Sequence, residues 1–258
     1  MNSNANYSST HIMAITAAKI LQDRKSVFVG TGLPMIAAMY AQRTHAPELL
    51  IIFEAGAIGP QMKVLPISVG DSRTFYRAIA ASSMHDNMGF SQAGWLDYGF
   101  LGAAQIDKFG NINTTYIGGT WDKPKVRLPG SGGANDVGSF CHNTIIIMRQ
   151  DKLRFVDNVE FITTPGYLDG PNDRERVGLP ANSGPLKVVT QLGVFGFHNK
   201  TKEMILENLH PGISIEQVKN NSGFDLLISE DLQETQLPNK EDVELLKELD
   251  PTGMAIGK

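Results

Sequence analysis

Two short apolar segments and the stretch between them constrain the fold more than any other feature of this sequence. Residues 26–29 read SVFV and residues 49–53 read LLIIF. A nearly continuous apolar run is typical of a strand buried on both faces of a parallel sheet. Between them, the turn at residues 30–34 (GTGLP) ends in a proline that suits the first turn of a helix, and MIAAMYAQRTH follows. Residues 26–53 therefore predict a β-α-β unit, which needs a parallel sheet with helices packed on it.

The remaining segments predict a single mixed α/β domain. Residues 11–25 carry apolar side chains at helical spacing, which indicates an amphipathic helix. Strands are also predicted at residues 98–106, 112–117, 144–148, 154–163, 186–190, 193–197 and 204–209, helices at 214–220 and 240–249, and irregular loops at 55–70 and 118–138. Because no linker divides these segments, we expect residues 11–258 to form one domain and residues 1–10 to be a disordered tail.

Composition and charge exclude several classes of function. The 23 Lys and Arg residues against 27 Asp and Glu leave a net charge of -4, which gives no electrostatic footprint for nucleic acid or an anionic membrane. Because the chain has one cysteine, neither an intrachain disulfide nor a cysteine-based zinc site can form. No apolar run reaches transmembrane length, and the polar N-terminus is unlike a signal peptide, so we expect a soluble cytoplasmic protein.

The common catalytic motifs are missing from the sequence. The six histidines show no metal-binding spacing such as H-E-x-x-H, so we expect no metal. The nucleophile motif G-x-S-x-G is absent. Cys141 and His142 are neighbours in sequence, but a nucleophile and its base need spatial reach rather than adjacency. We therefore expect Cys141 to be a small buried hydrophobe.

Three segments have a functional interpretation with a plainer one beside it. Glu54 ends a buried strand, where open α/β sheets bind ligands, or else it is an edge carboxylate that accepts hydrogen bonds from the following amides. The turn with Gly30 and Gly32 presents amides before a helix, as anion sites do, or merely lets the chain turn. Gly132 and Gly133 supply the amides of an oxyanion hole or belong to a flexible loop. From local pattern alone, these alternatives stay open.

Taken together, the order and spacing of six segments are more specific than any one of them. The segments are VGTGLP, FEAGAIGP, GAAQIDKFGNINTT, PGSGGANDV, NTIIIM and FVDNVEFITTPGYLDG. In this order they resemble the β subunits of family I CoA-transferases, of the glutaconate CoA-transferase type. The resemblance runs from about residue 11 to the C-terminal helix and so covers nearly the whole chain.

The resemblance implies covalent chemistry on Glu54. In that family the glutamate of an E-S/N-G motif is the nucleophile, and the matching segment here is Glu54-Ala55-Gly56, with alanine in place of Ser or Asn. The alanine leaves the carboxylate and the glycine of the motif in place, so we expect it to affect the details of the site more than the type of reaction. Glu54 would attack the thioester of an acyl-CoA, take up CoA as a glutamyl-CoA thioester and pass it to a second carboxylic acid in a ping-pong sequence.

The same resemblance implies the other site residues. Gly132 and Gly133 correspond to the oxyanion-stabilising loop of the family. Gly30 and Gly32 match the glycine turn that lines the site, and Gln105 lies in the G-A-x-Q motif found near it.

The fold and the partners also follow from the resemblance. The fold would be a three-layer α/β/α arrangement with a mixed sheet, shared with sugar-phosphate isomerases. CoA would be a co-substrate, with no cofactor permanently bound. The active site would lie between this chain and a separate α subunit in a hetero-oligomer, α2β2 or larger, so this chain alone would be inactive.

Two other functions remain open on the sequence. One is a CoA-ester hydrolase or decarboxylase of the same fold, with Glu54 as a general base. Homologues with these activities lack the glutamate, so Glu54 argues against them. The other is a catalytically silent assembly or sensor subunit, because fold does not imply function. The acid itself is not readable from the sequence, although an arginine facing the site, from among Arg73, Arg77 and Arg127, would favour a dicarboxylate.

Overall fold

The computed structural model describes residues 7–257 of the chain. Its helices are α1 (Ser9–Ala18), α2 (Leu33–Arg43), the 3-10 helix η1 (Ser72–Phe75), α3 (Met84–Gln92), α4 (Ala134–Phe140), α5 (Asp173–Arg176), α6 (Ile215–Asn220) and α7 (Lys240–Leu249). Its strands are β1 (Ser26–Val29), β2 (Leu50–Ile52), β3 (Ala57–Ile58), β4 (Ala80–Ala81), β5 (Tyr98–Leu101), β6 (Gln105–Ile106), β7 (Ile112–Asn113), β8 (Tyr116–Gly119), β9 (Pro124–Arg127), β10 (Asn143–Ile147), β11 (Gly184–Val189), β12 (Gly193–Phe197), β13 (Met204–Leu209) and β14 (Leu227–Glu234). The predicted β-α-β unit is present as β1, α2 and β2.

Ten of the strands form one mixed sheet. Their order is β14-β13-β12-β11-β10-β5-β1-β2-β3-β4. The five central strands, from β11 to β2, run parallel to one another. On either side of them the sheet continues with antiparallel pairs, β11 with β12 and β2 with β3. The parallel centre brings the carboxyl ends of β1, β2 and β5 to one edge, which is where ligands bind in open α/β sheets.

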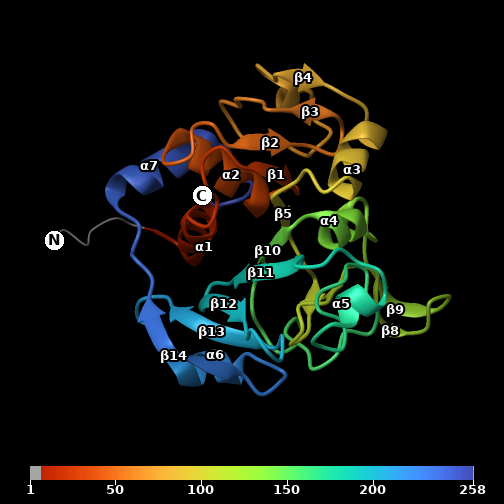
Figure 1. The fold of residues 1–258 in the computed structure, drawn as a ribbon. Coiled ribbons are helices and arrows are strands. Elements are labelled where there is room, and N and C mark those ends of the chain that lie inside the picture. The colour runs from red at the N-terminus through yellow and green to blue at the C-terminus, as the bar shows by residue number, and fades with distance from the viewer. Residues whose placement is uncertain (1–6, 258) are drawn as a thin grey trace.

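Two apolar cores lie on opposite faces of this sheet. Because side chains alternate along a strand, Val27 and Val29 of β1 belong to one core and Phe28 belongs to the other. Helices α1, α2 and α7 cover the first face, and α4 and α6 contribute to the core on the second (Figure 1). The expected three-layer α/β/α arrangement with a mixed sheet is therefore confirmed.

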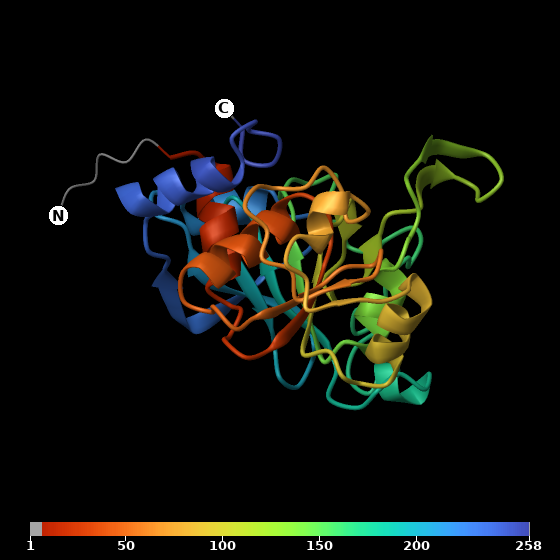
Figure 2. The ribbon, with the colours of Figure 1, turned by 90° about the horizontal axis from the view of Figure 1, so that it is seen from above.

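Several predicted elements differ in the structure: the predicted helix 11–25 ends at Ala18, the predicted loop 55–70 contains β3, and the predicted strand 112–117 divides into β7 and β8. Residues 154–163 form no strand, because the strands beside them, β6 and β7, are only two residues long; the chain makes one bridge to each, at Phe155 and at the following Thr164. The predicted strand 98–106 breaks after β5, and β6 instead pairs with β7 in a separate two-stranded sheet. The predicted loop 118–138 contains β9 and α4. Figure 2 shows the β8–β9 hairpin standing away from the rest of the chain.

The first helix begins inside the segment 1–10 that was predicted to be a disordered tail. Residues 1–6 of the predicted tail lie outside the described residues, whereas Ser9 and Thr10 already belong to α1. The Ser8 side chain and the Nδ1 atom of His11 close a capping box at the start of that helix. Among the helices of residues 7–257, none is long and apolar enough to cross a membrane.

His210 joins three strand ends through a neutral imidazole. Its Nε2 donates to the carbonyl of Thr190, which follows β11 (2.8 Å), and its Nδ1 accepts from the hydroxyl of Thr235, which follows β14 (2.7 Å). Because a carbonyl oxygen can only accept, these bonds fix the proton on Nε2. Burial lowers the pKa of His210 below its usual value of 6.5.

We expect His210 to make the fold less stable in mild acid. Because its pKa is lower in the folded than in the unfolded chain, its contribution is fully present above pH 6.5 and is lost as the pH falls toward the folded pKa. The free energy of unfolding, measured with urea between about pH 5 and 8, should therefore fall more steeply on the acid side in the wild type than in His210→Gln. Parallel profiles for the two proteins would contradict this account.

Candidate active site

Glu54 lies on the tight turn between β2 and β3. Phe53 N donates to Ala57 O at 2.9 Å, and Gly56 N donates to Phe53 O at 3.0 Å, so hydrogen bonds close the turn on both sides of Glu54. Phe53 is fully buried, whereas Glu54 is half-buried. The turn is therefore anchored in the core and carries the carboxylate at the edge of the sheet.

The conformation and surroundings of Gly56 explain why the predicted motif has a glycine at this position. Its φ of +115° lies in the region that favours glycine, and a Cβ on this residue would overlap the carbonyl oxygen of Ser82. Ser82 N also donates to Gly56 O at 2.9 Å. The segment before α3 thus packs directly on the turn that carries Glu54, and a side chain at position 56 would push the two apart.

The glycine loop before α4 lies against the Glu54 side chain. A Cβ built on Gly132 would lie 3.9 Å from both carboxylate oxygens, and one built on Gly133 would lie 3.5 Å from the carboxyl carbon. Gly132 has a φ of +50°, so the loop also takes a conformation that most residues avoid. The structure therefore brings together Glu54, Gly132 and Gly133, which are far apart in sequence.

Two backbone amides of this loop have no partner. Within residues 7–257, neither Gly132 N nor Gly133 N donates a hydrogen bond. The loop itself is fixed, because Gly130 N donates to Thr114 O at 2.8 Å and the Thr114 hydroxyl donates to Gly130 O at 2.9 Å. A fixed loop that presents free N–H groups beside a carboxyl carbon can stabilise an oxyanion that forms there.

The turn with Gly30 and Gly32 leaves the sheet on the same edge as Glu54. Strands β1 and β2 are parallel, with Phe28 opposite Ile52, so the chain two residues further on reaches Gly30 in one strand and Glu54 in the other. Gly32 has a φ of +84° and precedes the first turn of α2. The predicted glycine turn and the predicted nucleophile are thus neighbours at the carboxyl edge of the sheet.

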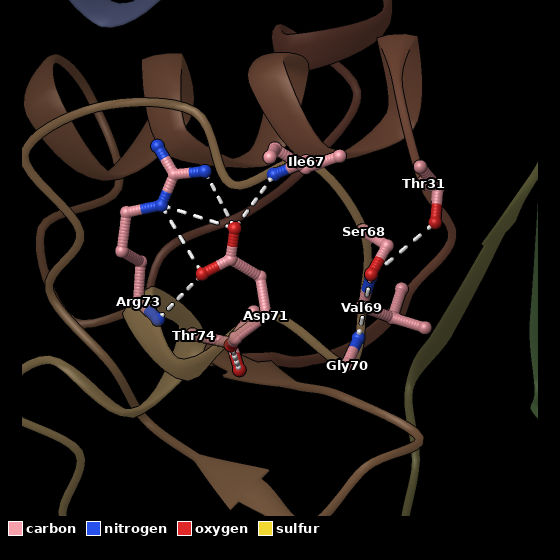
Figure 3. A network of polar contacts seen from close by, with 8 residues as sticks. All are labelled: Thr31, Ile67, Ser68, Val69, Gly70, Asp71, Arg73 and Thr74. Atoms are coloured by element: carbon pink, nitrogen blue, oxygen red, sulfur yellow. Dashed lines mark hydrogen bonds and ion pairs between the residues drawn. The ribbon is translucent and has the colours of Figure 1, made fainter.

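The last part of the predicted loop 55–70, which follows β3, lies against this glycine turn (Figure 3). Val69 N donates to the Thr31 hydroxyl at 3.4 Å. Nearby, Asp71 accepts from the guanidinium and backbone N–H of Arg73 and from Ile67 N. These bonds hold the pKa of Asp71 well below its usual range, and the bond from the Arg73 guanidinium has the largest effect.

Gln105 is engaged away from Glu54. Its Oε1 accepts from Asn113 Nδ2 at 2.9 Å, and its Nε2 donates to Leu153 O at 3.2 Å. The side chain is buried, and both ends of its amide link β6 to neighbouring segments. A part for Gln105 in the site therefore stays a prediction from the family resemblance.

No cation among residues 7–257 pairs with Glu54. Within residues 7–257, its carboxylate forms no ion pair and accepts no hydrogen bond. Arg73 and Arg127 bond to their own neighbours, and Arg77 lies over an aromatic ring. Within the described residues, the carboxylate is therefore free to act as a nucleophile.

Metal ligands do not gather anywhere in the described part of the chain. No three His, Cys, Asp or Glu side chains lie together as the ligands of a metal ion would. The expectation that the protein uses no metal stays a prediction.

Helix α3 belongs to the surroundings of the site, and sequence reasoning missed it. Asn87 Nδ2 donates to Phe53 O at 2.8 Å, and the Met88 methyl occupies the space that a Cβ on Gly133 would need. The buried residues of α3 are Asn87 and Ser91, which are both polar. A helix that buries polar side chains gives no apolar periodicity, so no sequence signal pointed to it.

Cys141 follows α4 and is fully buried, with its Sγ 3.5 Å from the Ser91 hydroxyl. Burial raises the pKa of its thiol to about 12. Since the thiolate is the reactive form, this cysteine should be inert in the folded protein. The expectation of a buried structural cysteine is confirmed.

We expect Cys141 to resist thiol reagents until the chain unfolds. The aromatic disulfide DTNB should label the native protein at least about 100-fold more slowly than the protein in guanidinium chloride, because labelling needs an exposed thiolate. The chain has one cysteine, so released chromophore reports on this position alone. Stoichiometric labelling of the native protein at the denatured rate would contradict the burial of Cys141.

Comparisons with known proteins show the family to which the chain is similar. The profile of a family described as "Coenzyme A transferase" matches residues 10–221. The chain is 40% identical over 245 residues to the β subunit of 3-oxoadipate CoA-transferase from Pseudomonas knackmussii. This match covers 95% of this chain and 94% of that protein. It is 40% identical over 252 residues to the β subunit of glutaconate CoA-transferase from Acidaminococcus fermentans, with the same coverage of 95% and 94%. The crystal structure of glutaconate coenzyme A-transferase from Acidaminococcus fermentans superposes with a TM-score of 0.91 at 39% identity, covering 98% of each chain.

Proposed function

The chain belongs to the coenzyme A transferase family, and we propose that Glu54 is the residue on which it carries CoA in covalent form. The protein is the β subunit of a heteromeric CoA-transferase, which moves CoA from an acyl-CoA to a carboxylic acid. One observation supports the part given to Glu54 above all. Its carboxylate lies against Gly132 and Gly133, and within residues 7–257 neither that carboxylate nor the two amides have a hydrogen-bond partner.

The first half-reaction forms a thioester on the protein. An oxygen of the Glu54 carboxylate attacks the thioester carbon of the acyl-CoA, and the C–S bond breaks to give an acyl-glutamyl anhydride and the CoA thiolate. The thiolate then attacks the carboxyl carbon of Glu54, and the donor acid leaves as its carboxylate. Both steps pass through an oxyanion, which each amide of Gly132 and Gly133 would stabilise by about 3 kcal/mol.

The second half-reaction reverses these steps with another acid. The carboxylate of the acceptor attacks the glutamyl thioester, and the CoA thiolate leaves and then attacks the acyl carbon of the new anhydride. The new acyl-CoA departs, and the Glu54 carboxylate is restored. No electron and no net proton are exchanged, so the chemistry needs a nucleophile, oxyanion donors and a site that excludes water.

We propose that the α subunit closes the site. Glu54 is half-buried in this chain, and an anhydride exposed to water would hydrolyse. Both relatives are named as β subunits, which implies an α subunit as partner. We therefore expect an α2β2 or larger complex with an active site between the two kinds of chain, and no transfer activity from this chain alone.

The acid is proposed to be a short dicarboxylate. The relatives are named for glutaconate and 3-oxoadipate, which both carry a second carboxylate. A cation from either subunit would bind this second carboxylate.

Isotope exchange between an acyl-CoA and its own acid, with no second acid present, tests this function. The complex of both subunits is incubated with the CoA ester of one acid and with the same acid in labelled form, using acetate, glutaconate and 3-oxoadipate in turn. Because the first half-reaction is reversible without an acceptor, label should enter the acyl-CoA at a rate similar to that of full turnover. Loss of acyl-CoA without exchange would contradict the transfer mechanism and point to hydrolysis or decarboxylation.

A further inference from the structure

Helix α3 contacts both halves of the site, although the proposed chemistry uses none of its residues. On one side, Asn87 Nδ2 donates to the carbonyl of Phe53, the residue that precedes Glu54 (2.8 Å). On the other side, the methyl of Met88 covers Gly133. Two adjacent residues of one helix thus hold the turn of the nucleophile and the glycine loop.

The bond from Asn87 acts on the peptide that leads into Glu54. Phe53 O accepts from Asn87 Nδ2 and also from Gly56 N at 3.0 Å, so both of its lone pairs are used. Asn87 and Phe53 are both fully buried, so water does not compete for this carbonyl. The two bonds together fix the direction in which the Glu54 side chain leaves the sheet.

Packing alone does not explain an asparagine at this position. Within residues 7–257, Asn87 Oδ1 is buried and has no hydrogen-bond partner, which is unfavourable. A leucine has a similar shape and would fill the same space without burying an unpaired oxygen. What leucine lacks is the N–H group, so the bond to Phe53 O is the property that the asparagine adds.

Helix α3 is held firmly enough to act as a spacer. At its start, Ser83 Oγ accepts from Asp86 N at 3.1 Å and donates to the Asp86 carboxylate at 2.8 Å. Toward its end, the buried Ser91 hydroxyl lies 3.5 Å from Cys141 Sγ, directly after α4. The cap therefore fixes the start of the helix, whereas the contact of Ser91 with the thiol is weak and adds little.

We propose that Asn87 is a positioning residue, which holds the Glu54 carboxylate at the separation from the Gly132 and Gly133 amides that CoA transfer needs. This inference rests on the function proposed for Glu54. Asn87 contacts no substrate, so its loss should leave the binding of acyl-CoA unchanged. It should lower the rate of attack, because a displacement of about 1 Å at a reacting group can reduce the rate about 100-fold.

The test compares Asn87→Leu with Ser91→Ala in the complex of both subunits. Ser91 is buried on the same helix one turn further on and has no contact with the turn of Glu54, so it is a matched control. For each variant, kcat and KM are measured for donor and acceptor, together with the thermal unfolding midpoint and the fraction of Glu54 that forms a thioester in a single turnover.

We expect Asn87→Leu to lower kcat by about 100-fold with KM for acyl-CoA within about twofold of the wild-type value. Its unfolding midpoint should be unchanged or higher, since the unpaired oxygen is gone. Ser91→Ala should keep wild-type kcat. If Asn87→Leu does not fold, Asn87→Ala also removes the N–H donor, adds no charge, and should show the same fall in kcat.

Two results would overturn the inference. If the wild-type complex forms a thioester on Glu54 and Asn87→Leu forms it at the same rate, Asn87 is not a positioning residue, and the proposed function stands. If the wild-type complex transfers CoA but never forms a thioester on Glu54, both the proposed function and the inference fail.

Discussion

Replacement of Glu54 by glutamine is expected to lower kcat for CoA transfer by at least about 10³-fold. The amide keeps the size of the side chain but is not a nucleophile, so neither the anhydride nor the glutamyl thioester can form. Because Glu54 makes no hydrogen bond or ion pair within residues 7–257, its loss should leave the unfolding midpoint and the binding of acyl-CoA nearly unchanged. Steady-state transfer and calorimetric unfolding of the complex measure both effects.

Two further variants serve as comparisons: one moves the carboxylate of residue 54, and the other removes a carboxylate elsewhere on the chain. Glu54→Asp keeps the charge but withdraws the carboxylate by one methylene, so we expect a loss of about 100-fold. Glu48→Gln removes an exposed carboxylate that pairs with Arg24, and it should transfer CoA at the wild-type rate. Transfer by Glu54→Gln within tenfold of the wild type would rule out covalent chemistry on this residue.

The second large effect is expected for Gly133→Ala, with kcat reduced by about 100-fold. The added methyl would lie 3.5 Å from the Glu54 carboxyl carbon, in the space where the reacting acyl group and the oxyanion must fit. It would also displace the methyl of Met88, which is the flexible end of a long side chain, so the fold itself should lose little stability. Comparison of kcat with the unfolding midpoint distinguishes these consequences.

Gly89→Ala is the control for this substitution. Gly89 lies in α3, and a Cβ on it would meet nothing within 4 Å, so alanine there should leave transfer intact and strengthen the helix slightly. If Gly133→Ala retains wild-type kcat, the space beside Glu54 is not the place of the reacting group.

The sequence predicted the central part of the fold because burial there is complete. Strands β1 and β2 lie inside the sheet, so their residues are apolar almost without interruption, and the helix between them begins with Pro34 at its first turn. Helix α3 could not be predicted in this way, because the residues it buries are Asn87 and Ser91. Its partners are a backbone carbonyl and a thiol, which only the folded chain brings near.

The strand predicted at residues 154–163 was wrong for a different reason. Its composition suits a strand, but strand pairing also needs a neighbour of matching length, and β6 and β7 beside it are only two residues long. The segment therefore stays irregular and makes a single bridge through Phe155. Local pattern reports on burial and says nothing about which neighbours are available.

The candidate site was predicted in its parts but not in its arrangement. The family resemblance identified Glu54, Gly132 and Gly133, and only the structure shows that the glycines lie against the carboxylate. Gln105 was predicted from the same resemblance; its amide bonds to Asn113 and Leu153, and its part in the site stays a prediction.

Mass spectrometry of the Glu54 peptide tests the central claim most directly. The complex of both subunits is incubated with an acyl-CoA and no acceptor acid, and then treated with borohydride, which reduces a thioester to an alcohol, or with hydroxylamine, which converts it to a hydroxamate. We predict that both products appear at Glu54, only when acyl-CoA is present and not in Glu54→Gln. A complex that transfers CoA at full rate and yields an unmodified Glu54 peptide would contradict the claim that this residue carries the coenzyme.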